Sequence, residues 1–318
     1  MILCIGEAVI DMFQKNVPGL GEVFLPLPGG CSYNTSIAIS RLGSPAAFIG
    51  RLSTNFFGKI QIERLRENNV RDDLLIRCDQ NPILAFIKTE EGRQPQYAFY
   101  DEGTADRLLS TDELPPLPPE TTCIVFGSVS MCMEPIATTI ETFINKAAEK
   151  TVIAFDPNIR PMMIKDRAAY LKRFEKWAGV STIVKISAED YEYVDSGKNP
   201  REALRNILAM GSRLVIITLG PDGAAAMLRR DDGSVIETGS PAFDAGIVAD
   251  TVGAGDTFLG TFLVWLRQRN KLSHNAIANL SENDLNDALT FANKAAAIVC
   301  TRRGAEPPTL EEIGSTYI

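Results

Sequence analysis

Residues 250–258 read DTVGAGDTF and mark the point where a β-rich segment gives way to a helix. The helix is predicted from apolar side chains at helical spacing, namely Phe258, Leu259, Phe262, Leu263 and Leu266. The first N–H groups of a helix have no partner one turn back. Those of Gly253, Ala254 and Gly255 are therefore expected to point outward as an anion cradle. Asp256 lies beside this cradle, where a carboxylate can accept the proton of an attacking hydroxyl.

The short sequence Gly-Ala-Gly-Asp also suits an ordinary tight turn, with Asp256 as a helix N-terminal residue, since acids are favoured there. Short motifs of this kind often occur without function. The longer pattern Asp-Thr-x-Gly-Ala-Gly-Asp resembles the C-terminal signature of the ribokinase-like (PfkB) carbohydrate kinases. The resemblance implies that Asp256 is the catalytic base and that the amides of residues 253–255 stabilise the transferring phosphoryl group.

The composition is that of an ordinary globular protein, with 318 residues, 45% hydrophobic and 23% charged. A formal net charge of -8 with scattered basic residues disfavours a nucleic-acid partner. No apolar run is long enough to cross a bilayer, and the N-terminus enters a predicted strand rather than a signal peptide. The six dispersed cysteines include no Cys-x-x-Cys pair and are typical of reduced thiols, so a cytoplasmic protein is expected.

Several other enzyme classes are disfavoured by the sequence. The single histidine, His274, lies in a polar stretch expected to be a solvated loop, so a triad hydrolase or a multi-histidine zinc site is a poor match. Neither Gly58-Lys59 nor Gly197-Lys198 continues as a nucleotide-binding P-loop. The first strand leads into Gly6-Glu7-Ala8 instead of a dinucleotide fingerprint, which disfavours a nicotinamide enzyme.

Strands alternate with helices through most of the chain. This pattern predicts one α/β domain over residues 1–318, with a doubly wound, mostly parallel sheet and helices on both faces. Strands are expected at 2–6, 47–50, 123–126, 152–155, 182–186 and 214–218, and helices at 56–68, 135–150, 166–178 and 284–301. Short strands broken by residues 90–93 predict a hairpin, and the family resemblance implies a small β-sheet lid inserted from about 12–27 and 80–105.

The N-terminal part carries a second signature. Residues Gly29, Gly30 and Asn34 match the Gly-Gly-x-x-x-Asn form of the same kinase family, just before a predicted helix. Asp11 follows the first strand, where open α/β sheets bind ligands, although alone it is equally typical of a turn. An Asn amide both donates and accepts, which suits a sugar hydroxyl. By resemblance, the two glycines, Asp11 and Asn34 form the sugar site.

Two further residues are assigned to the substrate. Tyr100 lies in the run 97–106, which resembles bacterial fructokinases and whose aromatic residues are expected to be divided between core and pocket wall. Arg160 follows the strand ending near residue 155 and is within reach of a phosphate or sugar oxygen, or forms a salt bridge on the sheet rim.

The nucleotide side is assigned mainly by resemblance. Residues 185–190 occupy the place of the family's Asn-x-x-Glu motif, which organises magnesium through water, but the matching positions hold Ser187 and Asp190. Glu189 or Asp190 is expected to serve Mg²⁺, since oxygen atoms and retained waters are its usual ligands. The residues assigned to ATP are Lys185, Ser187, Thr218, Gly220, Gly223 and Asn293, the last facing the adenine.

A monovalent-cation loop is also implied by resemblance. Many relatives hold a cation with the carbonyls of this region, and the matching residues are Asp250, Val252, Val299, Arg302 and Gly304. Pro308 stands where some relatives use a serine hydroxyl, so dependence on K⁺ is left open.

These observations predict an ATP- and Mg²⁺-dependent sugar kinase, with fructose as the sugar. The same family contains 2-keto-3-deoxygluconate kinases and ribokinases, and Arg160 suits a keto-acid substrate, so these alternatives stay open. A non-catalytic sugar-binding relative is disfavoured by the presence of Asp256. An exposed lid sheet also offers a surface for a homodimer.

Overall fold

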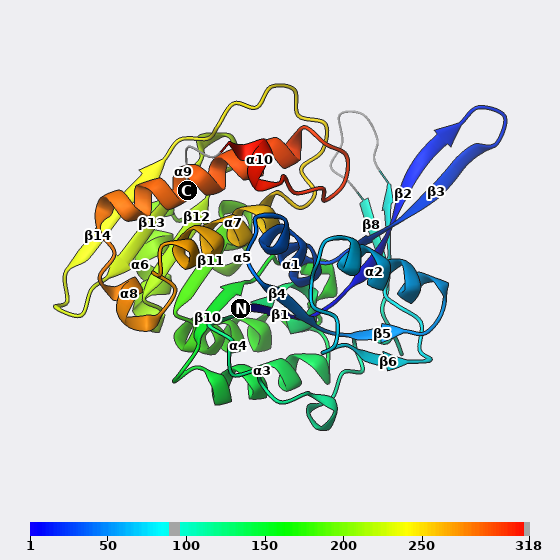
Figure 1. Ribbon diagram of the computed structural model, residues 1–318, viewed down its shortest axis with the longest axis horizontal. Helices are drawn as coiled ribbons and strands as arrows, with labels where there is room; N and C mark the ends of the chain where they lie inside the picture. Colours follow the sequence, from blue (N-terminus) through cyan, green and yellow to red (C-terminus); the bar gives the residue numbers. More distant parts are fainter. Residues whose placement is uncertain (89–95, 315–318) are drawn as a thin grey trace.

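The computed structural model describes residues 1–88 and 96–314, which are built around an eight-stranded central sheet (Figure 1). Six neighbouring strands of this sheet, namely β4, β1, β9, β10, β11 and β12, are parallel. Two antiparallel strands, β13 and β14, complete the edge next to β12. In spatial order the strands are β14 (Val235–Ser240), β13 (Ala224–Arg229), β12 (Leu214–Thr218), β11 (Ile183–Ser187), β10 (Val152–Asp156), β9 (Cys123–Gly127), β1 (Ile2–Ile5) and β4 (Ala46–Ile49).

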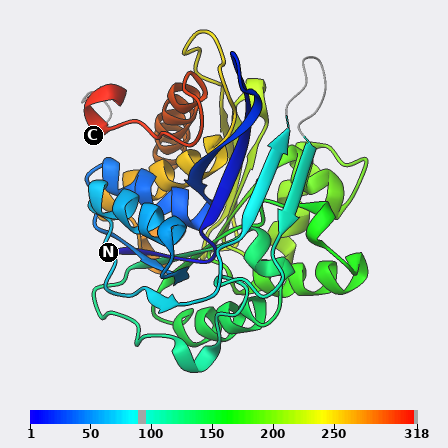
Figure 2. The same ribbon diagram turned by 90° about the vertical axis from the view of Figure 1, so that its right-hand side faces the viewer.

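Helices cover both faces of this sheet, as Figure 2 shows. One layer contains α1 (Cys31–Arg41), α7 (Ala254–Gln268) and α9 (Glu282–Cys300), and the opposite layer contains α3 (Ile136–Ala147), α4 (Arg167–Val180) and α6 (Pro200–Met210). The shorter or peripheral helices are α2 (Phe56–Glu67), α5 (Ala188–Val194), α8 (His274–Ala278) and α10 (Leu310–Ile313), with 3₁₀ turns η1 (Thr111–Glu113), η2 (Ser128–Cys132), η3 (Pro161–Met163) and η4 (Gly220–Asp222). No helix in the described part of the chain is long and apolar enough to span a membrane.

Alternation along the central strands creates two hydrophobic cores. Ile2 and Cys4 of β1 pack into the core shared with α1, α7 and α9, whereas Leu3 and Ile5 pack into the core on the other face. This is the two-sided burial expected of a parallel strand. The prediction of a doubly wound, mostly parallel α/β fold is confirmed.

A separate four-stranded sheet projects from one side of the molecule (Figure 1). Its order is β3 (Gly21–Gly29), β2 (Val9–Val17), β7 (Leu84–Lys88) and β8 (Gln96–Tyr100), which lie on the two segments expected to form a lid. The turn predicted at residues 90–93 lies outside the described residues. Two more short strands, β5 (Arg51–Ser53) and β6 (Ile76–Cys78), pair with each other.

The predicted boundaries differ from the structure for identifiable reasons. Helix α4 begins one residue later than expected because the Asp166 side chain accepts from the Ala169 N–H at 3.0 Å as an N-cap. Helix α9 begins earlier because Ser281 forms a capping box with Asp284. The expectation of a solvated loop at His274 is wrong. This partly buried residue begins α8, and its Nδ1 lies 3.3 Å from Thr182 Oγ1.

Candidate active site

Two helix N-termini meet at the carboxyl edge of the central strands. Helices α1 and α7 pack against each other, and each begins in a glycine-containing turn of the two sequence signatures. Gly253 precedes α7 with φ of 77°, and a Cβ there would lie 2.6 Å from the Cβ of Ala305. A side chain at position 253 would therefore both strain the backbone and collide with the neighbouring loop.

Asp256 lies in the first turn of α7 and is 6% exposed. Its Oδ2 accepts a hydrogen bond from Asn34 Nδ2 of α1 at 2.9 Å, which joins the two signatures. Burial raises the pKa of Asp256 to about 6, with hydrogen bonds from Asn34 and Cys31 opposing the rise. At neutral pH the carboxylate is mostly ionised and yet basic enough to accept a proton, as general-base catalysis requires.

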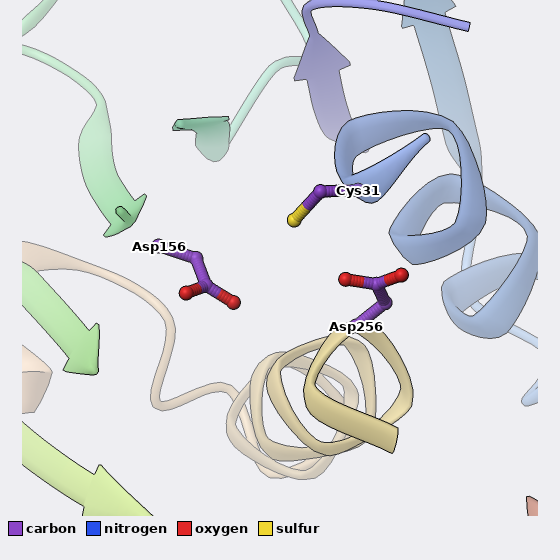
Figure 3. Close-up of side chains that lie close together, drawn as sticks. All are labelled: Cys31, Asp156 and Asp256. Atoms are coloured by element: carbon purple, nitrogen blue, oxygen red, sulfur yellow. The ribbon is translucent and has the colours of Figure 1, made fainter. Parts of the chain in front are cut away.

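A buried ion pair lies next to this carboxylate. Asp156, at the end of β10, accepts from Lys185 Nζ of β11 at 2.9 Å, and both residues are almost completely buried. Figure 3 shows Asp156 and Asp256 with Cys31 around one small space, and one ligand atom from each lies within 4.8 Å of the others. Burial opposes the charge on Lys185, but the adjacent Asp156 outweighs this effect and raises the pKa of the amine.

Lys185 also reaches the start of α7. A Cβ at Gly255 would lie 2.7 Å from Lys185 Nζ, so the amine is next to the predicted anion cradle. The structure differs from the prediction at Ala254, whose N–H donates to Thr251 O at 3.2 Å. Within residues 1–88 and 96–314, no protein group accepts from the N–H of Gly255 or Asp256, so these two amides with Lys185 form the positive end of the site.

Two of the residues assigned to the sugar, Asn34 and Asp11, interact with Asp256. Asp11 of β2 packs so tightly on Gly29 that a Cβ at position 29 would be 2.1 Å from Asp11 Oδ2. Burial and the nearby Asp256 raise the pKa of Asp11 to about 7, while Arg160 lowers it. Asn34 Oδ1 is buried and has no partner in the described structure, so it is available to a substrate hydroxyl.

Arg160 and Tyr100 are the two further residues assigned to the substrate. The Nη1 atom of Arg160 donates to the carbonyls of Asn158 and Ile159, at 3.3 and 3.0 Å. Over the described ranges, Arg160 forms no salt bridge of the kind considered from the sequence. Tyr100 ends β8 with 63% of its surface exposed, and its ring packs edge-on against Phe86 of the same small sheet.

The loop predicted to organise magnesium is held by side chains. Ser187 caps α5 by accepting from the Asp190 N–H at 3.0 Å, and Asp190 Oδ1 accepts from the Ile159 N–H at 2.8 Å. Burial and nearby Asp156 raise the pKa of Asp190, whereas Glu189 is exposed to solvent. The motif therefore joins the ends of β10 and β11 and leaves Glu189 facing outward.

The remaining residues assigned to the nucleotide lie at the end of β12, in the turn after it and in helix α9. Thr218 ends β12, Gly220 lies in the exposed 3₁₀ turn η4, and Gly223 is buried at the start of β13. Asn293 of α9 is 8% exposed, and its Nδ2 donates to the carbonyls of Ser240 and Pro241 at 3.1 Å each. The Asn293 amide thus anchors the segment after β14 to the helix.

The predicted cation loop brings together two distant segments. Asp250 Oδ1 accepts from the Val252 N–H at 3.1 Å, and its Oδ2 accepts from the Gly304 N–H at 2.9 Å. The Val299 carbonyl accepts from the Arg302 N–H at 3.0 Å. Because a carbonyl oxygen has two lone pairs, this bond leaves Val299 O able to contact a cation as well.

Sequence reasoning missed three buried acids around the site. Asp156 directly follows the strand expected at 152–155, and an acid after an apolar strand is the same signal that pointed to Asp11. Glu7 accepts from the Cys31 N–H at 3.1 Å and from the Ser130 hydroxyl, and burial raises its pKa. Asp106 accepts from the Ala8 N–H at 2.8 Å, and burial raises its pKa to about 7.

Comparisons with known proteins identify the family to which this chain belongs. Residues 1–312 match the model described as pfkB family carbohydrate kinase. A fructokinase of Rhizobium leguminosarum bv. trifolii is 38% identical over 286 residues, covering 90% of this chain and 85% of that protein. The crystal structure of a fructokinase with bound ATP from Xylella fastidiosa superposes with a TM-score of 0.88 at 25% identity, covering 98% and 96% of the two chains. An aminoimidazole riboside kinase from Salmonella enterica shares the fold, with a TM-score of 0.82, 24% identity and full coverage of both chains.

Proposed function

Because the chain belongs to the pfkB family of carbohydrate kinases, we propose that it transfers the γ-phosphoryl group of ATP to the primary hydroxyl of D-fructose. The products are fructose 6-phosphate and ADP. The observation that carries the proposal is the buried Asp256, with a pKa of about 6, between the sugar-side Asn34 and the cationic start of α7. Fructose is favoured by the 38% identity to the Rhizobium fructokinase.

Asp256 acts as the general base in this reaction. Its ionised carboxylate accepts the proton of the primary hydroxyl as that oxygen attacks the γ-phosphorus of ATP. The hydrogen bond from Asn34 orients the carboxylate, and its position in the first turn of α7 keeps it next to the amides that face the phosphoryl group. Proton transfer and phosphoryl transfer are thus performed by adjacent parts of one helix terminus.

Charge on the transferring phosphoryl group is stabilised by the start of α7 and by Lys185. The N–H groups of Gly255 and Asp256 point out of the helix, and the ammonium of Lys185 lies beside them. Ala254 stabilises the turn through the bond from its N–H to Thr251 O, and Gly253 adopts the left-handed backbone conformation of this turn. Donors fixed before the reaction stabilise developing charge without reorganisation, which makes them effective in a buried site.

The sugar is held by Asp11, Gly29, Gly30 and Asn34, with Tyr100 and Arg160 as further contacts. The carboxylate of Asp11 accepts sugar hydroxyls, and the free Oδ1 of Asn34 accepts another. We propose that the four-stranded sheet is a lid on the single domain, which closes over the sugar and excludes water that would otherwise hydrolyse ATP.

ATP is held by Lys185, Ser187, Thr218, Gly220, Gly223 and Asn293, and Mg²⁺ is the metal proposed to accompany it. Among the two acids assigned to the metal, Glu189 fits best because it is exposed, whereas one oxygen of Asp190 already accepts from a backbone amide. Carboxylate oxygens acting through water are suited to magnesium. When bound, the metal would neutralise nucleotide charge, and Glu189 is the residue of this chain that would hold it through water.

A monovalent cation, K⁺, is proposed at the loop of Asp250, Val252, Val299, Arg302 and Gly304. The two Asp250 hydrogen bonds to the chain hold this loop directly before the catalytic turn. Carbonyl oxygens are hard ligands, so the donor set suits such an ion. With the cation bound, these five residues would fix the orientation of the turn at Gly253.

Two wider features of the protein are also proposed. The small sheet exposes apolar side chains, including Leu20, Phe24 and Leu25, so we propose that it forms a homodimer contact. All six cysteines are free thiols, which supports a reducing compartment such as the cytoplasm.

The function is tested with a panel of acceptors in an ADP-release assay using Mg-ATP, with and without K⁺. The panel contains fructose, ribose, 2-keto-3-deoxygluconate and a nucleoside. We expect the highest kcat/KM with fructose. A higher value with 2-keto-3-deoxygluconate would favour the alternative in which Arg160 binds a substrate carboxylate, and no turnover with any acceptor would contradict the kinase assignment.

Asp11 provides a test of the sugar site. Asp11→Ala is expected to raise the KM for fructose about 10- to 100-fold with a smaller effect on kcat, because it removes hydrogen-bonding oxygen atoms from the sugar but not from the reacting atoms. Asp11→Asn, which keeps one acceptor, should give an intermediate KM. Steady-state kinetics measure both values, and an unchanged KM for Asp11→Ala would mean that Asp11 has only a structural role.

A further inference from the structure

A cluster of three potential metal ligands lies beside the catalytic base. One ligand atom each from Cys31, Asp156 and Asp256 lies within 4.8 Å of the other two, and all three residues are buried (Figure 3). They come from three different elements, namely the first residue of α1, the last of β10 and the first turn of α7. The tertiary fold therefore gathers a thiol and two carboxylates around one point.

The hydrogen bonds leave a coordinating atom on each carboxylate. Asp156 Oδ2 accepts from Lys185, but its Oδ1 is completely buried and has no partner in the part of the chain that the structure describes. Asp256 Oδ2 accepts from Asn34, which leaves Oδ1 facing the cluster. A buried carboxylate oxygen without a partner is rare and costly, and it points to a missing cation or donor.

We propose that a thiophilic divalent cation of the Zn²⁺ type binds between Cys31, Asp156 and Asp256 and thereby inhibits the kinase. Zinc takes sulfur and carboxylate ligands in a tetrahedral arrangement, which leaves a fourth position for water. With ligand distances of ~2.0–2.3 Å, the three atoms need to approach one another to within ~3.3–3.8 Å. Metal binding therefore requires these three side chains to rotate toward one another.

The chemistry of binding follows from the same contacts. Burial and the neighbouring carboxylates raise the pKa of Cys31, so the free protein holds a neutral thiol. The metal forms a bond to sulfur and the thiol proton is released to solvent, as metal binding by cysteine requires. Lys185 keeps Oδ2 of Asp156 while the metal takes Oδ1, so the ion pair and the metal are compatible.

Inhibition rests on the proposed role of Asp256, whereas metal binding does not. A cation bound to Asp256 occupies the lone pair that would accept the proton of the sugar hydroxyl. Mg²⁺ prefers an octahedral shell of oxygen atoms and waters, so a site with a buried sulfur ligand disfavours it. The site thus distinguishes an inhibitory metal from the metal that accompanies ATP.

Binding is tested on the full chain with Co²⁺ alone, in the absence of sugar and nucleotide. We expect one equivalent of Co²⁺ to produce a thiolate-to-cobalt charge-transfer band that is abolished in Cys31→Ala and displaced by Zn²⁺. Cys123→Ala is the matched control, because it also removes a buried thiol but from the core at β9, and it should keep the band. Co²⁺ that binds without a thiolate band would overturn the proposal.

The functional consequence is tested with buffered free Zn²⁺ and direct measurement of sugar phosphate. For each variant, the ratio of the inhibited to the uninhibited rate is measured as a function of the free Zn²⁺ concentration, which gives the apparent inhibition constant. We expect Cys31→Ser, which preserves volume, to weaken inhibition at least about 10-fold, the scale of losses at metal sites, and Cys123→Ala to match the wild type. Equal sensitivity of Cys31→Ser and the wild type would refute the inhibitory site. Because the cobalt experiment needs no turnover, a protein that binds the metal but lacks kinase activity would contradict the proposed function and leave the metal site standing.

Discussion

Replacing Asp256 with asparagine is expected to lower kcat about 10²- to 10⁴-fold, the usual contribution of a general base, while fructose affinity changes little. Asparagine has nearly the same shape and its carbonyl can still accept from Asn34 Nδ2, so the junction between α1 and α7 is preserved. What it lacks is the ability to take the proton from the sugar hydroxyl. Steady-state kinetics and equilibrium binding of fructose measure the two effects separately.

The pH dependence gives an independent test of this residue. Burial raises the pKa of Asp256 to about 6, so its ionised form, and with it kcat, should decline as the pH falls through about 6. The residual activity of Asp256→Asn should lack this acidic limb. Asp287→Asn makes the same chemical change at an exposed position of α9 and should keep both rate and profile. A kcat for Asp256→Asn within a few-fold of the wild type would remove Asp256 from the role of base.

Replacing Lys185 with methionine is expected to reduce both stability and turnover. Removing one member of a buried ion pair leaves Asp156 charged and uncompensated, which typically costs about 3–5 kcal/mol in the free energy of unfolding. Loss of a preorganised positive group at the phosphoryl site should lower kcat about 10²- to 10³-fold. Urea unfolding and steady-state kinetics measure the two consequences.

A double variant separates the structural and chemical parts of this effect. In Asp156→Asn/Lys185→Met, the buried charge is removed together with its partner, so most of the lost stability should return. The loss in kcat should remain because the ammonium next to Gly255 is still missing. Recovery of kcat together with stability would mean that Lys185 serves only to compensate Asp156.

The parts of the fold that could be predicted are those determined by local sequence. The strands around Ile2, Ile124 and Ile153 are short apolar runs bounded by turn residues, and their burial on both faces makes them recognisable without neighbours. The antiparallel strands β13 and β14 were not predicted. Strand β14 is an edge strand with alternating exposure, which offers a weak apolar signal.

The candidate site could be predicted only in part for a related reason. Asp256 and Asn34 stand in recognisable motifs, and the 2.9 Å bond between their side chains joins those motifs in space. Asp156 was overlooked because its importance depends on Lys185 and Asp256, which are distant in the chain. The expected cradle is altered at Ala254, whose N–H donates to Thr251 O, in a turn that lies against the distant Ala305.

By itself, the sequence determined the α/β class, the turn at residues 250–258 and the identity of the acid within it. These follow from hydrophobic periodicity and from backbone requirements that act over a few residues. Only the tertiary structure decided which charges share the buried space around Asp256, and therefore its pKa of about 6. Electrostatic effects in a buried site depend on distance and on exclusion of water, and both arise when strands and helices far apart in the chain pack together.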